Sequence, residues 1–169
     1  MPKLHPLILV AAAASLAVLL LARAWIAARR RAHAYYLRQS LLTPAEAAFL
    51  PVLESALPPG IRVFGKVRLE DVLGVRSDLD RGEGQAARNR INRKHVDFLL
   101  VRSGTLAPVA GIELDDRSHD AADRQARDRF VDAAFASAGL PLLHVPVRAS
   151  YPTAELRRLL ADLLSHSPR

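Results

Sequence analysis

Cysteine is missing from the 169-residue sequence. Without it the chain forms no disulfide bond and holds no zinc through thiolates, and its sequence indicates no redox compartment. Internal repeats are missing as well, and the length suits one domain plus an appendage. These absences point to one domain without covalent cross-links.

Acidic residues are missing from the first 42 residues, which hold six of the 24 lysines and arginines. This segment therefore accounts for +6 of the formal net charge of +7. The remaining 127 residues carry 18 basic and 17 acidic side chains and are nearly neutral. The high isoelectric point thus reflects the N-terminal segment and says little about nucleic-acid binding by the rest.

An apolar run of 17 residues, "PLILVAAAASLAVLLLA", occupies Pro6–Ala22. Roughly 17–25 apolar residues span a bilayer. Trp25, Tyr35 and Tyr36 suit the membrane interface, and positive charge gathers after the run at Arg29–Arg31. By the positive-inside rule we expect a single-pass helix in the inner (cytoplasmic) membrane with the C-terminal domain in the cytoplasm.

Two other interpretations of this run stay open. "ARA" at Ala22–Ala24 resembles a signal-peptide cleavage site, after which the chain would be exported. A buried soluble helix would need a larger surrounding core than the rest of the chain offers. With the anchor favoured, the predicted parts are a transmembrane anchor (1–28), a basic juxtamembrane linker (29–42), a globular domain (43–165) and a tail (166–169).

Local signals predict the first elements of the globular domain. "TPAE" at Thr43–Glu46 is a capping box with proline at the first helical position, so a helix should run to about Leu57, where "PPG" ends it. The alternating segment "IRVFGKVRL" predicts a half-exposed strand over 61–69. The polar stretch Arg76–Lys94 is expected to be a long loop with room for a short helix.

The second half predicts a hairpin, a helix, a strand and a helix. The strands are His95–Val101 and its antiparallel partner Pro108–Asp115. Apolar residues recur every four positions over 121–138, which indicates an amphipathic helix that Gly139 ends. "LPLLHVPV" is apolar throughout and should be a central strand, and a last helix is expected over 152–165. The predicted fold is α/β in the order α-β-β-β-α-β-α, with a mixed sheet flanked by helices.

Acidic side chains gather where the two hairpin strands meet. Asp97 begins one strand and Glu113 ends the other, so an antiparallel pair places them side by side. An acid such as Asp97 inside an apolar run needs a partner. Glu113 and Asp115 share a face, and His119 follows them. Such a density of oxygen ligands suits Mg²⁺ or Mn²⁺, which could activate water and stabilise a phosphodiester transition state.

The same residues also have a purely structural interpretation. Charged residues near strand ends are often solvated, and Asp120 could cap the following helix. His144 lies in the apolar strand and is more often a satisfied core histidine than a ligand. The basic residues before Asp97 either contact backbone phosphates or form a solvated loop, and no aromatic residues lie among them for base stacking. The candidate nucleic-acid-binding residues are Arg88, Arg90, Arg93, Lys94 and, from the later helix, Arg127.

The order and spacing of these motifs resemble the restriction-endonuclease-like PD-(D/E)XK superfamily, in particular relatives of the very-short-patch-repair endonuclease. The matching features are Asp97, an E-x-D-x-x-x-H pattern at Glu113, Asp115 and His119, and a following helix with Asp123 and Arg127. "KHVDFLLV", "IELDDRSH" and "RQARDRFVDAAFASAGLPLL" are also similar to a bacterial domain of unknown function, the 2726 family. The resemblance covers about 42–147.

The resemblance implies a metal-dependent nuclease fold with Asp97 and Glu113 as ligands and Asp115 as a third. The superfamily usually has lysine two residues after the glutamate, to orient the attacking water, whereas this chain has Asp115. In the very-short-patch-like relatives a histidine helps, which implies a catalytic role for His119. Lys94 and Arg127 are other candidates for the missing positive charge, and Glu46 or Glu54 could add a carboxylate.

Three functions follow as hypotheses. The leading one is a membrane-anchored nuclease that hydrolyses phosphodiester bonds with Mg²⁺ or Mn²⁺. The second is a degenerate nuclease fold that binds nucleic acid or a partner protein at the membrane. The third is an anchored interaction domain whose acidic residues only cap a loop.

Overall fold

The computed structural model describes residues 6–32, 35–115 and 121–166, without the side chains of residues 9, 30–32 and 121–128. The chain divides into two compact units, Met1–Gln39 and Ser40–Arg169. The first unit contains α1 (Pro6–Ala32), the one described helix long and apolar enough to cross a membrane, with a mean hydropathy of 2.4. Signal sequences and core helices of soluble proteins can have the same length and composition.

The second unit is built on a mixed four-stranded sheet. Its strands β1 (Ile61–Arg68), β2 (His95–Arg102), β3 (Pro108–Asp115) and β4 (Leu142–Pro146) lie in the order β1-β2-β3-β4. β1, β2 and β3 pair antiparallel in turn, and β4 runs parallel to β3. The predicted mixed α/β class and the antiparallel hairpin are therefore confirmed.

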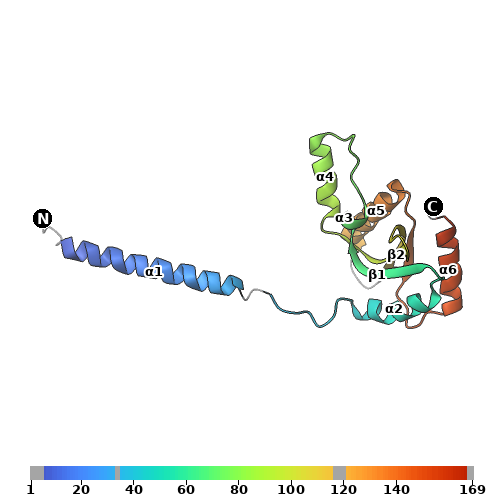
Figure 1. Ribbon diagram of the computed structural model, residues 1–169, viewed down its shortest axis with the longest axis horizontal. Helices are drawn as coiled ribbons and strands as arrows, with labels where there is room; N and C mark the ends of the chain where they lie inside the picture. The colour runs from blue at the N-terminus through green and yellow to red at the C-terminus, as the bar shows by residue number, and fades with distance from the viewer. Residues whose placement is uncertain (1–5, 33–34, 116–120, 167–169) are drawn as a thin grey trace. The chain divides into compact units, whose positions relative to one another are not determined.

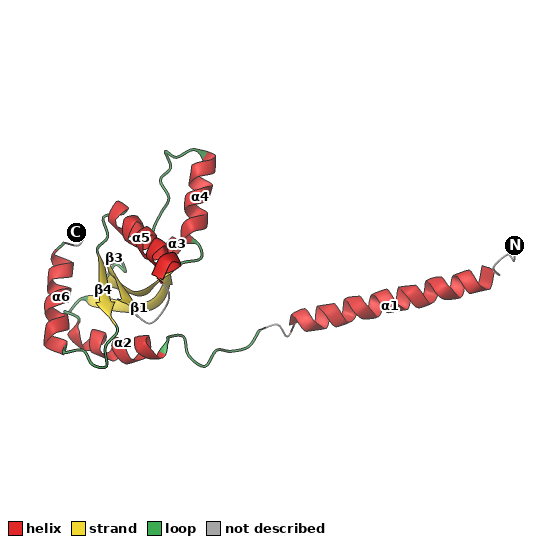
Figure 2. Ribbon diagram, turned by 180° about the vertical axis from the view of Figure 1, so that it is seen from behind, coloured by secondary structure: helices red, strands yellow, loops and turns green. Residues whose placement is uncertain are grey.

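Two helices cover one face of the sheet, as Figures 1 and 2 show. α2 (Pro44–Ala56) begins at the predicted capping box, in which the Thr43 side chain accepts from the Glu46 amide and the Glu46 side chain accepts from the Thr43 amide. α6 (Thr153–Ser165) packs beside it. Burial of apolar side chains between these helices and the sheet stabilises the fold. The fully buried members of this layer include Phe49, Leu53, Phe98, Leu100, Ile112 and Leu160.

The opposite face is covered chiefly by α5 (Ala121–Ser137), close to the predicted bounds and followed by Gly139 at a φ of +67°. Phe135 of α5 packs so closely on Gly111 of β3 that a Cβ there would lie 2.5 Å from the ring carbon Cε1. The glycine therefore lets the helix approach the strand. This layer also contains Leu69, Ile91, Val96, Leu99 and Leu140.

Two helices lie between β1 and β2, and the second of them falls within Arg76–Lys94, where a long loop with room for a short helix was expected. α3 (Leu69–Val72) is a single turn, and α4 (Arg81–Ile91) has 11 residues. Asp80 caps α4, since its Oδ1 accepts a hydrogen bond of 2.8 Å from the Glu83 amide. α4 projects from the domain in Figure 2 and is anchored at its C-terminal end by buried Ile91. Because so little of α4 is buried, the sequence carries no apolar stripe that would have predicted its length.

The prediction that the apolar strand at 140–147 is central is wrong, because β4 is an edge strand. Its apolar residues have a different cause. α5 and Leu142 lie on one face of the sheet, and α6 and Val145 on the other. Covering both faces of an edge strand removes the polar alternation that usually marks an edge.

Candidate functional site: a lysine between carboxylates

One level of the sheet carries a titratable residue on each strand. Register places Lys66 of β1 opposite Asp97 of β2, because the flanking pairs are Gly65–Phe98 and Val67–Val96. The pair Phe98–Ile112 places Glu113 of β3 next to Asp97, and Glu113 pairs in turn with His144 of β4. Four residues spread between positions 66 and 144 of the sequence are thus brought to one line across the sheet.

Lys66 joins α2 to the sheet through two ion pairs. Its Nζ lies 2.7 Å from Oε1 of Glu46 and 2.8 Å from Oδ1 of Asp97. We call Glu46, Lys66 and Asp97 the lysine cluster; their side chains are 8%, 27% and 14% exposed. Burial alone would lower the pKa of Lys66, but the hydrogen bonds from Lys66 to Asp97 and Glu46 outweigh it and raise the pKa above its ordinary value.

The backbone of Lys66 is unusual for a side chain of this kind. Its φ is +54°, in the left-handed region that residues other than glycine rarely adopt. Such a conformation costs on the order of 1–3 kcal/mol and persists only where the surroundings fix it. The two ion pairs are the interactions that fix it here. Strained backbone of this sort is concentrated at functional sites.

Asp97 is the most connected carboxylate of the site. Its Oδ2 accepts a 3.0 Å hydrogen bond from the Leu114 amide, and its side chain is also hydrogen-bonded to that of Glu113. Burial would raise the pKa of Asp97, but the hydrogen bonds from Lys66 and Leu114, with the charge of Lys66, lower it below its ordinary value. The strand register and this contact place the carboxyl group of Glu113 beside that of Asp97.

The lysine cluster contains one sequence-predicted site residue, Asp97, and one that was considered, Glu46. A second predicted residue, Glu113, lies next to Asp97 on β3. Glu46 is 6% exposed and is the one described charged residue that is buried, whereas Glu54 is exposed. Lys66 was missed by sequence reasoning. The sequence carried little signal for it, because Lys66 occupies a polar position in the alternation of "IRVFGKVRL", as Arg62 and Arg68 do, where a solvated lysine is expected.

Asp115 lies in a second group, on the β4 side. Its Oδ1 is 3.1 Å from Nδ1 of His144, whose Nε2 is 2.8 Å from Oδ1 of Asp132 on α5. We call Asp115, His144 and Asp132 the histidine cluster; their side chains are 48%, 33% and 51% exposed. Burial would lower the pKa of His144, but the hydrogen bonds to Asp115 and Asp132 raise it above its ordinary value. His144 is therefore hydrogen-bonded as expected, but it is not a core residue.

The structure describes the side chains of only some of the remaining predicted site residues. His119 and Asp120 lie outside the described residues, and Asp123 and Arg127 lie on α5 where side chains are not described. Lys94 does not approach the carboxylates; its Nζ bonds to the carbonyl of Arg90 at 2.8 Å. The positive charge that the sequence lacks after Glu113 is instead supplied by Lys66, from another strand.

The basic residues before Asp97 form a ridge at the C-terminal end of α4. Arg88, Arg90 and Arg93 are exposed. Two of the cations share one aromatic ring: the guanidinium carbon of Arg90 lies 5.4 Å, and Nζ of Lys94 4.8 Å, from the centroid of Phe130. Like charges held this close repel each other, so the ridge favours an anionic partner. Lys94 is followed at once by β2, which carries Asp97.

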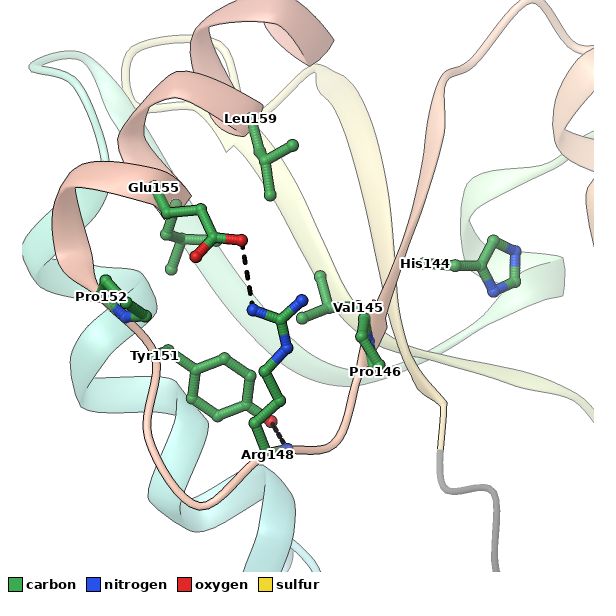
Figure 3. A pocket seen from close by; sticks show the side chains of 9 residues that line it. His144, Val145, Pro146, Arg148, Tyr151, Pro152, Glu155 and Leu159 are labelled. Carbon is green, nitrogen blue, oxygen red and sulfur yellow. Dashed lines mark hydrogen bonds and ion pairs between the residues drawn. The ribbon is translucent and has the colours of Figure 1, made fainter.

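A small pocket lies elsewhere, between β4 and α6 (Figure 3). The side chains of Val145, Tyr151 and Leu159 line it, and Arg148 reaches across to Glu155 with an ion pair of 3.1 Å. In Figure 3 His144, whose residue also borders the pocket, points away from it. The pocket therefore does not belong to the carboxylate groups.

The acidic side chains of this site provide few of the ligands that a divalent cation needs. Among the described residues no three histidine or acidic side chains are arranged to hold a metal ion. Asp97 and Glu113 nevertheless offer adjacent hard oxygen donors. Mg²⁺ is commonly held by only one or two carboxylates, with substrate phosphates and water completing its shell. These two residues meet that requirement, whereas Asp115 is engaged with His144.

The fold and site define a mixed α/β domain with a partly buried lysine between carboxylates at one level of its sheet. Residues 38–163 match the family described as "Protein of unknown function (DUF2726)", and the chain belongs to this family. Neither the curated proteins nor the solved structures contain a match to the chain. The expected membership of this family is confirmed, and the wider nuclease superfamily stays a prediction.

Proposed function

We propose that this protein is a membrane-tethered, metal-dependent nuclease that hydrolyses phosphodiester bonds with Asp97, Glu113 and Lys66. One observation carries the proposal. A carboxylate pair and an ammonium lie together on three adjacent strands, with Lys66 Nζ 2.8 Å from Asp97 and with Asp97 hydrogen-bonded to Glu113. A nuclease fold of the PD-(D/E)XK type needs a carboxylate pair and a nearby lysine.

Each residue has a distinct role in this reaction. Asp97 and Glu113 would hold Mg²⁺ or Mn²⁺, which when bound activates water and neutralises phosphate charge. The Leu114 amide orients Asp97 through its 3.0 Å hydrogen bond. The ammonium of Lys66 stabilises negative charge that develops on the phosphate or on the attacking water. His119 would add proton transfer.

The ridge on α4 suits the substrate. Nucleic-acid backbones are bound through phosphates by arginine and lysine, independently of sequence. Arg88, Arg90, Arg93 and Lys94 precede β2 in the chain and would contact backbone phosphates of the bound nucleic acid. Arg127 of α5 would extend this surface.

The N-terminal helix would place this activity at a membrane. α1 is apolar over Pro6–Arg29, and the charge after the run favours a C-terminal domain in the cytoplasm at the inner membrane. The cation–π contact between Arg29 and Trp25, at 4.7 Å, suits an interfacial position. Export after cleavage of a signal peptide is the alternative. A reporter active only in the cytoplasm, fused to the C-terminus, should work under the first arrangement and fail under the second.

A degenerate nuclease fold that only binds nucleic acid or a protein is the second candidate. The observation in its favour is that Lys66 already pairs with both Asp97 and Glu46 without a metal ion. A site that satisfies its own charges has less need of metal than one whose carboxylates repel each other. The two candidates agree on binding and differ on hydrolysis.

The decisive assay is cleavage of labelled single- and double-stranded DNA and RNA by the full chain in detergent with Mg²⁺ or Mn²⁺. We expect cleavage that falls by about 100-fold or more in Asp97→Asn and Glu113→Gln. Glu155→Gln, which removes an exposed carboxylate on α6, is the matched control and should cleave as the wild type does. Binding without cleavage under either metal would favour the degenerate fold.

A further inference from the structure

Glu46 is a buried acid that the proposed reaction does not use. It lies at the third position of α2, and its carboxylate has two partners, one on each oxygen. Oε2 accepts a 3.0 Å hydrogen bond from the amide of Thr43, and Oε1 accepts one of 2.7 Å from Nζ of Lys66. A carboxylate with both oxygens engaged and 6% of its residue surface exposed is fixed in place.

We propose that Glu46 is a positioning residue that holds the ammonium of Lys66 against Asp97. This inference rests on the proposed function in taking Lys66 as the cation of the site. The capping box explains why α2 begins with the Glu46 carboxylate turned toward its own N-terminus. That orientation leaves the second oxygen directed at β1, where Lys66 reaches it. The helix start thereby sets the position of a side chain on the sheet.

The strained backbone of Lys66 supports this assignment. A lysine has a flexible four-carbon stem and could reach solvent from an edge strand. At a φ of +54° it instead directs its ammonium into a gap between two carboxylates on two different elements. Either partner alone leaves the ammonium free to rotate about the other. Both together fix it between α2 and β2.

Packing of the residue just before the α2 capping box also holds this part of the chain against β1, next to Lys66. A Cβ at Gly65 would lie 3.2 Å from Cδ2 of Leu42, so Leu42 rests on the strand beside Lys66. Leu42 immediately precedes Thr43, the capping residue. The first residues of the second unit therefore contact β1 through Leu42 and bind Lys66 through Glu46.

Glu46→Gln separates the positioning role from the capping role. Glutamine can still close a capping box, but it has one acceptor oxygen and no charge. It cannot accept from Thr43 and pair with Lys66 as glutamate does. Thr43→Ala is the matched control, because it removes the hydroxyl that accepts from the Glu46 amide and leaves the bond from Lys66 in place. Circular dichroism would establish that both variants are folded.

The measurement is the rate at which each lysine of the full chain, in detergent, is acetylated by acetic anhydride, read by mass spectrometry. The sequence has only Lys3, Lys66 and Lys94, so Lys94 serves as an internal reference. We expect Glu46→Gln to raise the rate at Lys66 by about tenfold, the change that corresponds to 1.36 kcal/mol. Thr43→Ala should change it by less than about twofold, equivalent to 0.4 kcal/mol.

Two results would overturn the inference. One is an unchanged rate at Lys66 in Glu46→Gln. The other is an equal rise in Thr43→Ala, because Glu46 would then act only through the helix cap. The acetylation rate does not depend on catalysis. If Lys66 responds as expected and the wild type cleaves no nucleic acid, the positioning stands and the nuclease proposal fails. If cleavage is present, Glu46→Gln should lower kcat and leave KM unchanged.

Discussion

The lysine cluster and the histidine cluster each contain one basic side chain between two carboxylates from different elements. They differ in burial. The lysine cluster is 8–27% exposed in its side chains, and the histidine cluster 33–51%. They also differ in what the cation can do. Lys66 stays charged at neutral pH, while His144 has an ordinary pKa close to neutrality that its partners raise.

These differences in burial and in charge indicate different roles for the lysine cluster and the histidine cluster. A partly buried lysine that stays charged at neutral pH, beside a pair of carboxyl groups, would provide a fixed electrostatic environment for the proposed chemistry. A half-exposed histidine with both ring nitrogens engaged has none left for substrate, so it ties α5 to β3 and β4. Under the proposed function, the lysine cluster takes part in the chemistry and the histidine cluster gives structural support.

The largest expected effect is that of Lys66→Met. The variant removes the cation and leaves Glu46 and Asp97 as neighbouring, largely buried carboxylates. Losing one partner of a fully buried pair costs several kcal/mol, and because Lys66 is partly exposed we expect a loss of about 2–3 kcal/mol. Thermal unfolding followed by circular dichroism measures it. A loss below about 0.5 kcal/mol would mean that the cluster is no more than a surface ion pair.

Asp97→Asn should change how the free energy of unfolding depends on pH in the acidic range. The pKa of Asp97 is lowered in the folded state, so its contribution is present above the unfolded pKa of about 3.9 and is lost as pH falls through the lowered folded value. The wild type should therefore lose more stability than the variant between neutral pH and acid. Denaturant titrations at several pH values test this, and parallel curves for the two proteins would contradict it.

The contribution of the histidine cluster to stability should instead be lost as pH rises. The pKa of His144 is raised, so its contribution is fully present below about 6.5 and is lost as pH rises through the folded value. His144→Gln should remove this dependence, at a cost of no more than about 1 kcal/mol below neutrality, because the group is partly exposed. NMR titration of the imidazole gives the folded pKa directly, and a value at or below 6.5 would refute the assignment.

The smallest expected effect is that of Asp132→Asn, which removes one partner of His144 on α5. Exposed ion pairs contribute little, and we expect a loss of about 0.5 kcal/mol or less. Cleavage, where present, should be unchanged. A loss as large as that of Lys66→Met would erase the distinction between the two clusters.

Much of the fold was accessible from the sequence because its signals are local. The capping box at Thr43, the hairpin strands and the glycine after α5 depend on neighbouring residues, and the structure confirms them. The position of β4 at the sheet edge was not accessible. An apolar strand is compatible with a central place or with an edge covered on both faces, and only tertiary packing decides between them.

The candidate site likewise contains one contact that the sequence predicts and others that depend on tertiary packing. Asp97 and Glu113 were predicted to meet, because antiparallel strands place the start of one beside the end of the other, and their side chains are hydrogen-bonded. Lys66 and Glu46 meet them from an edge strand and a helix far away in sequence. No spacing rule relates these four residues, since the contact depends on how α2 lies across the sheet. The same holds for Asp132 and His144.

The most direct test of the central claim is Mn²⁺ binding to the full chain in detergent, followed by electron paramagnetic resonance. We predict a single Mn²⁺ bound in the wild type and in Glu155→Gln, and none in Asp97→Asn or Glu113→Gln. Asp115→Asn should still bind, because Asp115 is engaged with His144. Absence of binding in the wild type, or binding that survives the loss of Asp97 and Glu113, would contradict the assignment of this carboxylate pair as a metal site.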